Sequence, residues 1–484
     1  MSDMSMSNMS SEIKEEVRAT DPPEVSPAPA NVPDIVRIGA LPTNMQMSVD
    51  SDILEPVVKS QSFCRFVLEN KGLLHSNSKI VFSMAQTDIN SFMPLNVGAN
   101  SIIERAVLKV GTKTINSTED WNHYEAYRSM FISGENTKER EMITTGKSIN
   151  FGFHYEEDTD TTADEIRIDV GREYDRDADP TNNKTTFQNY MNLKNKREFQ
   201  INLSSLFTFL KMNQLPLFML REQVSIELHF TPLASTLADS KRVSVRSGAT
   251  VTGADLDIDL DSLKLVSDHI YYPTEVMDAF ARQNSNMTMS YMDYHLSKQT
   301  LTATESASAL NNIRNVGGAG KIITKLIVSL SNASASQHLL NAYNSRAMFG
   351  TNSLGNDSFS ASLVANVKYN GEFLYPIDVD NNARHFHNVQ QAEGTQPFVP
   401  KACYTSEVDN LTGDHFEDYK HDHISQRFFR QAYRLNKGER VNARGIELYH
   451  NYTKLNVHTY TQRVYLEQAK FANLSNGILV CYDA

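Results

Sequence analysis

The chain has 484 residues, 40% of them apolar, and its formal net charge is −12. This length exceeds what one hydrophobic core usually serves, so two domains are expected. The acidic balance argues against a broad nucleic-acid surface, because binding phosphates requires concentrated Lys and Arg. The longest apolar runs, such as 322–330, are far too short to span a membrane, and the start MSDMSMSNMS has no basic segment leading into an apolar one. We expect a soluble protein that is not exported.

Three cysteines, Cys64, Cys403 and Cys481, are spread along the whole sequence. They are too few and too scattered for a disulfide framework or a zinc ribbon. The cysteine content therefore predicts buried packing thiols and folding in a reducing compartment.

Residues 1–34 differ in composition from the rest of the chain. They include DPPEVSPAPANVPD, whose five prolines remove backbone donors and favour extended chain. We expect a tail that is disordered on its own and can order against a partner. Its acidic balance disfavours a DNA-binding arm, and Ser2 excludes myristoylation.

From about residue 35 the sequence changes to short runs typical of β-strands. Runs with β-branched or aromatic residues in partial alternation cover 61–70, 77–86, 101–110 and 197–206. The best helical pattern is 120–131, whose aromatic residues recur at helical spacing and are expected to pack over one end of a sandwich. The pattern predicts antiparallel β-sandwiches.

The stretch LPLFMLREQVSIELHF, 215–230, combines an apolar corner around Pro216 with a strand. We expect Leu217 and Phe218 in an apolar layer at the foot of the first domain. The strand alternates strictly, so one set should face the interior and the other set the opposite face. The interior set is predicted to be Val224, Ile226, Leu228 and Phe230, and the opposite set Ser225, Glu227 and His229.

The second half repeats this style. Strand-like runs cover 255–272, 320–330, 363–376, 444–453 and 476–482. A stretch rich in small and polar residues, 233–254, separates the halves and predicts the boundary. The predicted domains are therefore a tail over 1–34, a first domain over 35–235 and a second over 236–484. The same pattern of strand, glycine turn and strand occurs once in each half, in AVLKVGTKTI and in ANVKYNGEFLYP. This echo weakly indicates duplication.

Two motifs superficially suggest ligand binding. NVGGAGKI, 315–322, resembles a phosphate loop, but Asn315 replaces the first glycine, Ile322 replaces Ser or Thr, and a strand should follow instead of a helix. Asp255, Asp257 and Asp259 have the spacing of a calcium loop, but the turn glycine and the bidentate glutamate are missing. Both patterns favour ordinary turn and strand structure.

Two charged segments leave metal binding open. DHFEDYKHDH, 414–423, contains His415, His421 and His423 among four acids, but its spacing matches no defined site, so an exposed loop is favoured. Residues 151–180 hold eleven acids against three arginines and are more typical of a long solvated loop, with weak calcium binding as the alternative. Neither a nucleophile elbow, nor HExxH, nor a catalytic cysteine signature occurs. No catalytic, cofactor-binding or metal residue is assigned, and an enzyme is not expected.

Four segments together resemble one family, the double-jelly-roll major capsid proteins of eukaryotic double-stranded DNA viruses. REFQINLSSLFTFLKMNQLPLFMLREQVSIELHFTPL resembles the end of the first jelly roll, with a short helix at 203–210 before the Leu-Pro-Leu corner. The segment 101–131, KYNGEFLYP and the closing stretch 444–484 are similar to further features of that family. Length and motif style are nearest to the proteins of polinton-like viruses and virophages.

The resemblance implies a fold and an assembly. The fold is all-β, with two tandem eight-stranded antiparallel jelly-roll sandwiches, a few short helices and long loops. The function is that of a major capsid protein, a structural subunit whose pseudo-hexameric homotrimers tile an icosahedral shell in the virion after assembly inside the host cell. Implied partners are neighbouring capsomers, a single-jelly-roll penton protein and minor capsid proteins, without sequence-specific nucleic-acid binding and with membrane contact left open.

Two other classes remain as alternatives. A two-domain β-sandwich glycan-binding or attachment protein would also lack catalytic motifs, but the only tryptophan, Trp121, lies in a helix expected to pack. An enzyme built on a double β-barrel would have 414–423 as its only anchor. The capsid interpretation is preferred.

Overall fold

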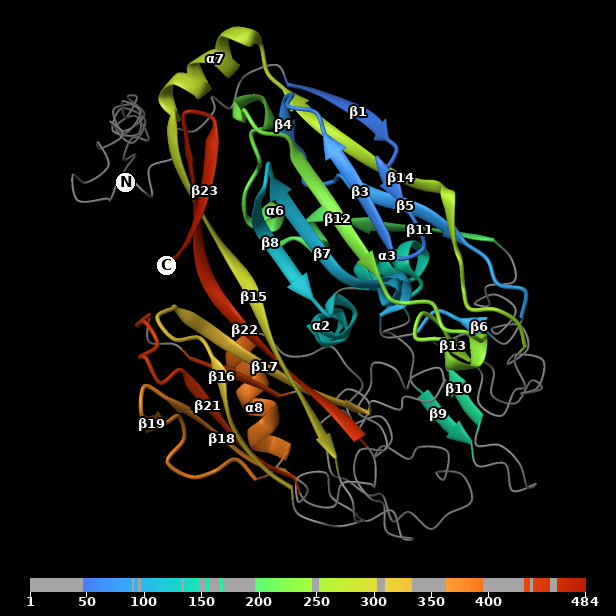
Figure 1. Ribbon diagram of the computed structural model, residues 1–484, viewed down its shortest axis with the longest axis vertical. Helices are drawn as coiled ribbons and strands as arrows, with labels where there is room; N and C mark the ends of the chain where they lie inside the picture. The colour runs from blue at the N-terminus through green and yellow to red at the C-terminus, as the bar shows by residue number, and fades with distance from the viewer. Residues whose placement is uncertain are drawn as a thin grey trace, which may run out of the picture.

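The computed structural model describes most of the chain from residue 47 onward. The described ranges are 47–88, 91–94, 97–131, 135–147, 153–156, 165–168, 196–245, 252–302, 310–332, 363–380, 382–394, 431–435, 438–452 and 459–484. Two β-sandwiches make up this part of the molecule, one in the upper and one in the lower half of the view in Figure 1. The predicted tail, 1–34, lies outside the described residues.

The first sandwich consists of two five-stranded antiparallel sheets. One sheet has the order β1 (Ser48–Leu54), β14 (Ile258–Tyr271), β5 (Lys79–Met84) and β11 (Arg197–Asn202), with β4 (Leu73–Leu74) also pairing with β14. The other has the order β2 (Val58–Lys59), β3 (Phe63–Leu68), β12 (Val224–Phe230), β7 (Ile103–Val110) and β8 (Lys113–Glu119).

The second sandwich pairs a five-stranded sheet with a four-stranded sheet. The larger sheet contains β15 (Asn286–Thr302), β22 (Thr459–Ser475), β17 (Ile323–Asn332) and β20 (Gln431–Arg434), with β23 (Ile478–Asp483) also on β22. The smaller contains β16 (Leu310–Gly317), β21 (Ile446–Tyr452), β18 (Leu363–Tyr369) and β19 (Glu372–Phe373). Two small two-stranded sheets complete the strands: β6 (Ser91–Phe92) with β13 (Ser244–Val245), and β9 (Phe153–Glu156) with β10 (Glu165–Ile168).

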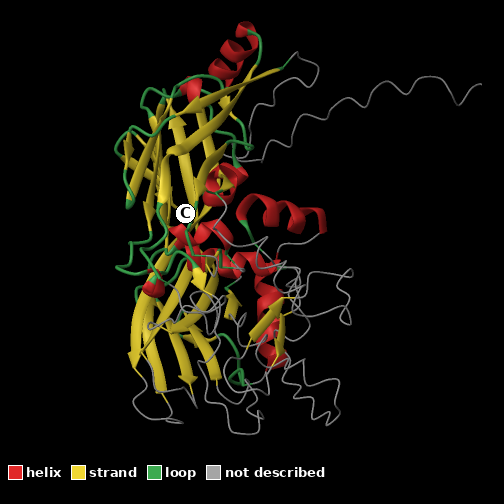
Figure 2. Cartoon of the chain, turned by 90° about the vertical axis from the view of Figure 1, so that its right-hand side faces the viewer, coloured by secondary structure: helices red, strands yellow, loops and turns green. Residues whose placement is uncertain are grey.

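Short helices connect and flank the sheets, as Figure 2 shows. The α-helices are α2 (Trp121–Arg128), α3 (Glu135–Thr145), α5 (Leu203–Leu206), α6 (Thr208–Met212), α7 (Thr274–Gln283) and α8 (Asn382–Glu393). The 3-10 helices are η2 (Gly98–Ile102), η3 (Ser129–Phe131), η5 (Leu217–Met219) and η6 (Leu237–Asp239). Among the described residues, no helix has the length and apolar character needed to cross a membrane.

Strand β12 confirms the predicted register. Its four apolar residues, Val224, Ile226, Leu228 and Phe230, are buried in the core of the first sandwich. The opposite set is less exposed than alternation alone suggests, because β12 is a central strand between β3 and β7. Glu227 is only 8% exposed and forms an ion pair with Lys109, their Oε2 and Nζ atoms 2.6 Å apart.

The apolar corner before β12 packs as predicted for one of its two residues. Leu217 is fully buried in the core cluster. Phe218 is half-buried, and its ring lies 6.3 Å from that of Phe280 on α7. The corner therefore joins the core of the first sandwich to the helix that leads into the second.

The two hairpins that suggested duplication occupy similar places in the two sandwiches. Strands β7 and β8 pair around Gly111, and β18 and β19 pair around Asn370 and Gly371. All three turn residues have positive φ, 58°, 53° and 92° respectively. Tight hairpin turns require this conformation, which glycine and asparagine tolerate best.

One predicted assignment needs correction. The strand over 255–272 was predicted to lie in the second domain, but β14 pairs with β1, β4 and β5 of the first sandwich. Strand pairing is non-local, so the sequence pattern identifies a strand without identifying its partner. After β14 the chain passes through α7 into β15, and we propose that the division between the sandwiches falls at α7 and not at 235/236.

Candidate functional site

The segment 315–322, which only superficially resembles a phosphate loop, joins two strands. Gly318 and Gly320 form the connection between β16 and β17, so a strand follows it as expected. The Asn315 side chain accepts a hydrogen bond from Gly317 N at 2.7 Å and donates one to the Arg444 carbonyl. The segment is a turn stabilised by its own side chain, and no helix N-terminus stands behind it to hold a phosphate.

Three of the four aspartates in 255–261, Asp255, Asp259 and Asp261, contact protein donors. Asp255 accepts a hydrogen bond from the backbone N–H of Ala234 at 2.8 Å. Asp259 forms an ion pair with Lys196, and Asp261 one with Lys59 at 2.8 Å. The segment becomes strand β14 from residue 258, as predicted, with a bulge between Asp259 and Lys264.

The remaining sequence candidates lie largely outside the described residues. This holds for His415, His421 and His423, for Cys403, and for most of 151–180, where only β9 and β10 are described. Within the described part of the chain, no group of three or more His, Cys, Asp or Glu side chains is arranged to hold a metal ion. Cys64 is a buried free thiol, as predicted, whereas Cys481 is only half-buried.

Polar contacts between distant parts of the described chain gather where the two sandwiches meet. Asp120, at the start of α2, is its centre on the first sandwich. Its carboxylate is 2.6 Å from Arg463 Nε and 2.5 Å from Lys298 Nζ, on β22 and β15 of the second sandwich. Its backbone carbonyl accepts a hydrogen bond from Tyr465 at 2.9 Å. One residue thus binds two strands of the other sandwich.

A second polar contact lies further along β15. Asp293 accepts a hydrogen bond from Asn116 of β8 at 2.6 Å and pairs with Lys470 of β22 at 2.6 Å. Tyr291, two residues earlier, donates a hydrogen bond to the Ile115 carbonyl at 2.7 Å. These contacts attach β15 to the edge strand of the first sandwich, where Figure 1 shows the two strands side by side.

Aromatic packing fills the space between these polar contacts. Tyr124 of α2 packs with its ring tilted against Tyr294 and Tyr465, with ring centroids 4.5 and 5.5 Å away. Phe209 of α6 meets Tyr291 edge-on at 5.1 Å. Such pairs add about 0.5–1.5 kcal/mol each beyond the area that they bury. The helix predicted to cover a sandwich end therefore packs against the second sandwich.

A buried acid–base group extends the junction to α8. Lys325 lies 2.8 Å from Glu393 of α8 and 3.2 Å from Glu467 of β22. Tyr127 of the first sandwich donates a hydrogen bond to Glu393 at 2.5 Å. Burial would lower the pKa of Lys325, but the two carboxylates outweigh burial and raise it. The Lys325 ammonium is therefore held in its charged form at neutral pH.

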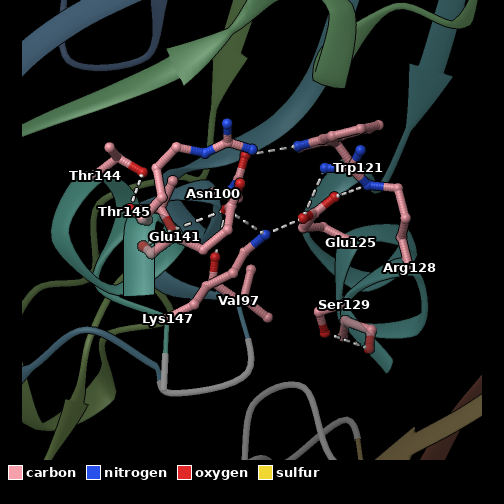
Figure 3. Close-up of polar contacts among 12 residues, drawn as sticks. Val97, Asn100, Trp121, Glu125, Arg128, Ser129, Glu141, Thr144, Thr145 and Lys147 are labelled. Carbon is pink, nitrogen blue, oxygen red and sulfur yellow. Dashed lines mark hydrogen bonds and ion pairs between the residues drawn. The ribbon is translucent and has the colours of Figure 1, made fainter. Parts of the chain in front are cut away.

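Helix α2 is anchored on its other side by a fully buried ion pair. Figure 3 shows the Glu125 carboxylate between Lys147 and Arg128, and both cations bond to it. Burial would raise the pKa of Glu125, but Arg128 and Lys147 outweigh it and the pKa is lowered. Trp121 donates a hydrogen bond from Nε1 to Asn100 at 3.1 Å. The helix that touches the second sandwich is thereby fixed rigidly to the first.

The junction residues carry no signal in the sequence that predicts their role. Asp120 and Arg463 have no local motif, and Lys325 looks like one more residue in a strand. The only usable signal was the conspicuous aromatic helix at 120–131. Its aromatic stripe was correctly predicted to pack, but the partner surface could not be known.

No family model and no curated protein sequence matches this chain. Several solved structures, in contrast, are similar to this chain. VP54 of PBCV-1, fitted into a cryo-EM reconstruction of the virophage Sputnik, has a TM-score of 0.57 at 9% identity, covering 92% of this chain and 99% of that one. The mavirus major capsid protein has a TM-score of 0.51 at 9% identity, covering 94% of this chain and 93% of that one. The Faustovirus major capsid protein has a TM-score of 0.51 at 8% identity, covering 95% of this chain and 96% of that one.

These likenesses extend over nearly the whole chain and therefore include both sandwiches. The chain has the double-jelly-roll fold, the fold of these viral capsid proteins. The predicted resemblance is confirmed at the level of fold.

Proposed function

We propose that this chain is a viral major capsid protein that forms homotrimers with a pseudo-hexagonal outline. The observation that carries the proposal is the fixed junction between two similar sandwiches in one chain. Three such chains place six similar barrels in a ring, which is the shape that tiles an icosahedral shell. The structural neighbours named above, which share this fold, support the same role.

The junction gives the proposed building block its rigidity. Polar, aromatic and acid–base contacts at Asp120, Asp293, Tyr124 and Lys325 join the sandwiches along their length. The buried apolar residues of both sandwiches also form one continuous cluster. A two-domain protein with a small polar interface would hinge, whereas a tile must present its edges at fixed angles to its neighbours.

The proposal assigns a structural and not a catalytic role. It places the protein in the virion after assembly inside the host cell. The expected partners are neighbouring capsomers, a penton protein and minor capsid proteins. Contacts within the trimer should be extensive, on the order of 2,000 Å² or more per interface, while contacts between trimers can be weaker and multiplied by number. No observation on the described residues favours the glycan-binding alternative.

Electron microscopy of the purified protein tests this proposal. Class averages should show particles with a near-sixfold outline and a threefold axis. Elongated two-lobed particles of single chains would contradict the proposal.

A further inference from the structure

Strand β23 presents an apolar row at an open sheet edge. Ile478, Val480 and Tyr482 are 41%, 46% and 42% exposed, while Leu479 between them is fully buried. Among the described strands β23 pairs only with β22, so its other edge is unpaired. Proteins usually protect such an edge with lysine, other charges or proline. The sequence ILVCYD has a charge only at its last position.

Strand β1 presents a second apolar row at an edge of the first sandwich. Val49 and Ile53 are 49% and 66% exposed, and Val57 and Val58 beside them are 69% and 47% exposed. Among the described strands β1 pairs only with β14. The first sandwich therefore also ends in an open edge with an apolar row beside it.

The two rows lie on opposite flanks of the molecule, as Figure 1 shows for β1 and β23. A contact between two different surfaces of identical chains is head-to-tail, and it closes into a ring when the rotation allows. The charges beside the two rows are complementary at one end of β23. Asp50 and Glu55 are exposed beside the β1 row, where the cation Lys59 already pairs with Asp261. At the turn end of β23, Arg221, in the segment before β12, is exposed and its backbone N–H bonds to the Gly477 carbonyl at 2.9 Å, and Lys113 Nζ lies 3.5 Å from the Leu479 carbonyl. The acid Asp483 lies at the opposite end of the strand.

We propose that the β23 row of one chain docks on the β1 row of the next chain and that three such contacts close the ring. This inference rests on the trimer of the proposed function and names the surfaces that make it. The rows are too small to form a whole obligate interface. They would form its apolar centre, surrounded by a polar rim.

Charge substitution in each row tests the contact. Val480→Asp and Ile53→Asp each bury an unpaired carboxylate at the interface, which is strongly unfavourable. Native mass spectrometry at micromolar concentration should show the mass of one chain for each variant and of three chains for the parent. The control is Ile313→Asp on β16, a residue that is 63% exposed and lies outside both rows, and this variant should remain a trimer.

A double variant gives the sharper result. Val480→Asp combined with Ile53→Lys should restore the trimer, because the two new charges meet across the contact. A parent trimer that persists unchanged in Val480→Asp overturns this inference and leaves the proposed function intact. A parent that is monomeric overturns the proposed function itself.

Cross-linking tests the same contact without disturbing its apolar character. Val480→Cys with Ile53→Cys, in a Cys481→Ser background, should give bands of two and three chains on oxidation in a non-reducing gel. Each single cysteine variant should give none. If the double cysteine variant is a trimer but yields no covalent product on oxidation, the assignment of these two rows to one interface is contradicted.

Discussion

Asp120 and Arg463 lie 343 positions apart in the sequence and form an ion pair between the two sandwiches, with 2.6 Å between Oδ2 and Nε. Asp120 adopts φ 46°, a left-handed conformation that aspartate and asparagine tolerate better than most residues. The side chains are only 6% and 12% exposed. This pair is therefore a mainly buried charge contact that fixes one sandwich on the other.

Removing the charge of Asp120 should loosen the junction. Asp120→Asn keeps the backbone preference and leaves Arg463 without its carboxylate, so the free energy of unfolding should fall by about 3 kcal/mol. Chemical denaturation measures the loss. The control is Asp261→Asn, which breaks an ion pair to Lys59 whose carboxylate is 92% exposed, and it should leave the denaturation midpoint unchanged. Equal behaviour of the two variants would mean that the junction contributes little.

Substitutions on the two faces of β12 should lower the free energy of unfolding by different amounts. Ile226→Ala removes a fully buried side chain and should cost about 2–5 kcal/mol. Because Glu227 is 8% exposed and paired with Lys109, Glu227→Ala should cost about 1 kcal/mol. Thermal unfolding of the two variants shows which substitution destabilises the protein more. A larger loss for Glu227→Ala would mean that the strand's ion pair outweighs its core contact.

Acid should destabilise the second sandwich through two buried histidines. Burial lowers the pKa of His385 to about 4 and that of His450 to about 3. Unfolded histidine titrates near 6.5, so the unfolded chain binds protons first and stability falls as pH drops below about 6.5, by about 1.4 kcal/mol per pH unit for each histidine. His450 lies between the hydroxyls of Tyr433 and Tyr452, at 3.1 and 3.0 Å.

His450→Gln should remove one of these two proton-linked contributions. Unfolding free energies measured between pH 7 and 5 should then have a shallower slope than those of the parent. The control is His387→Gln, an exposed position on α8, which should reproduce the parent slope. An unchanged slope in His450→Gln would show that this histidine is not held neutral in the folded chain.

The tail should matter for assembly and not for folding. Its proline-rich, polar composition cannot form a core, so a chain without residues 1–34 should still form the trimer. Shell assembly, or binding to inner-layer proteins, should be impaired. Sedimentation of the truncated protein before and after assembly conditions separates the two effects. Failure of the truncated chain to fold would mean that the tail belongs to the core.

The histidine cluster at 414–423 should be dispensable. Replacing His415, His421 and His423 with alanine should leave folding and assembly intact, because their spacing matches no metal site. Elemental analysis and particle mass of the triple variant provide the check. Loss of a bound metal together with loss of assembly would establish a metal site there.

Local patterns were enough to predict most strands and the aromatic helix. The alternation of Val224 to Phe230 identified β12 and its buried face, since strand side chains point alternately to opposite faces. Non-local features could not be predicted in this way. The pairing of β14 with β1 joins Tyr271 to Ser48, and the junction joins Asp120 to Arg463. The burial of Glu227 depends equally on its neighbouring strands, because Lys109 of β7 covers it.

The mass of the purified protein in solution tests the central claim most directly. Native mass spectrometry at micromolar concentration should give three times the 54.5 kDa mass of the chain, with no dissociation on moderate dilution, because the contacts within an obligate trimer are extensive. A monodisperse particle with the mass of one chain would contradict the account.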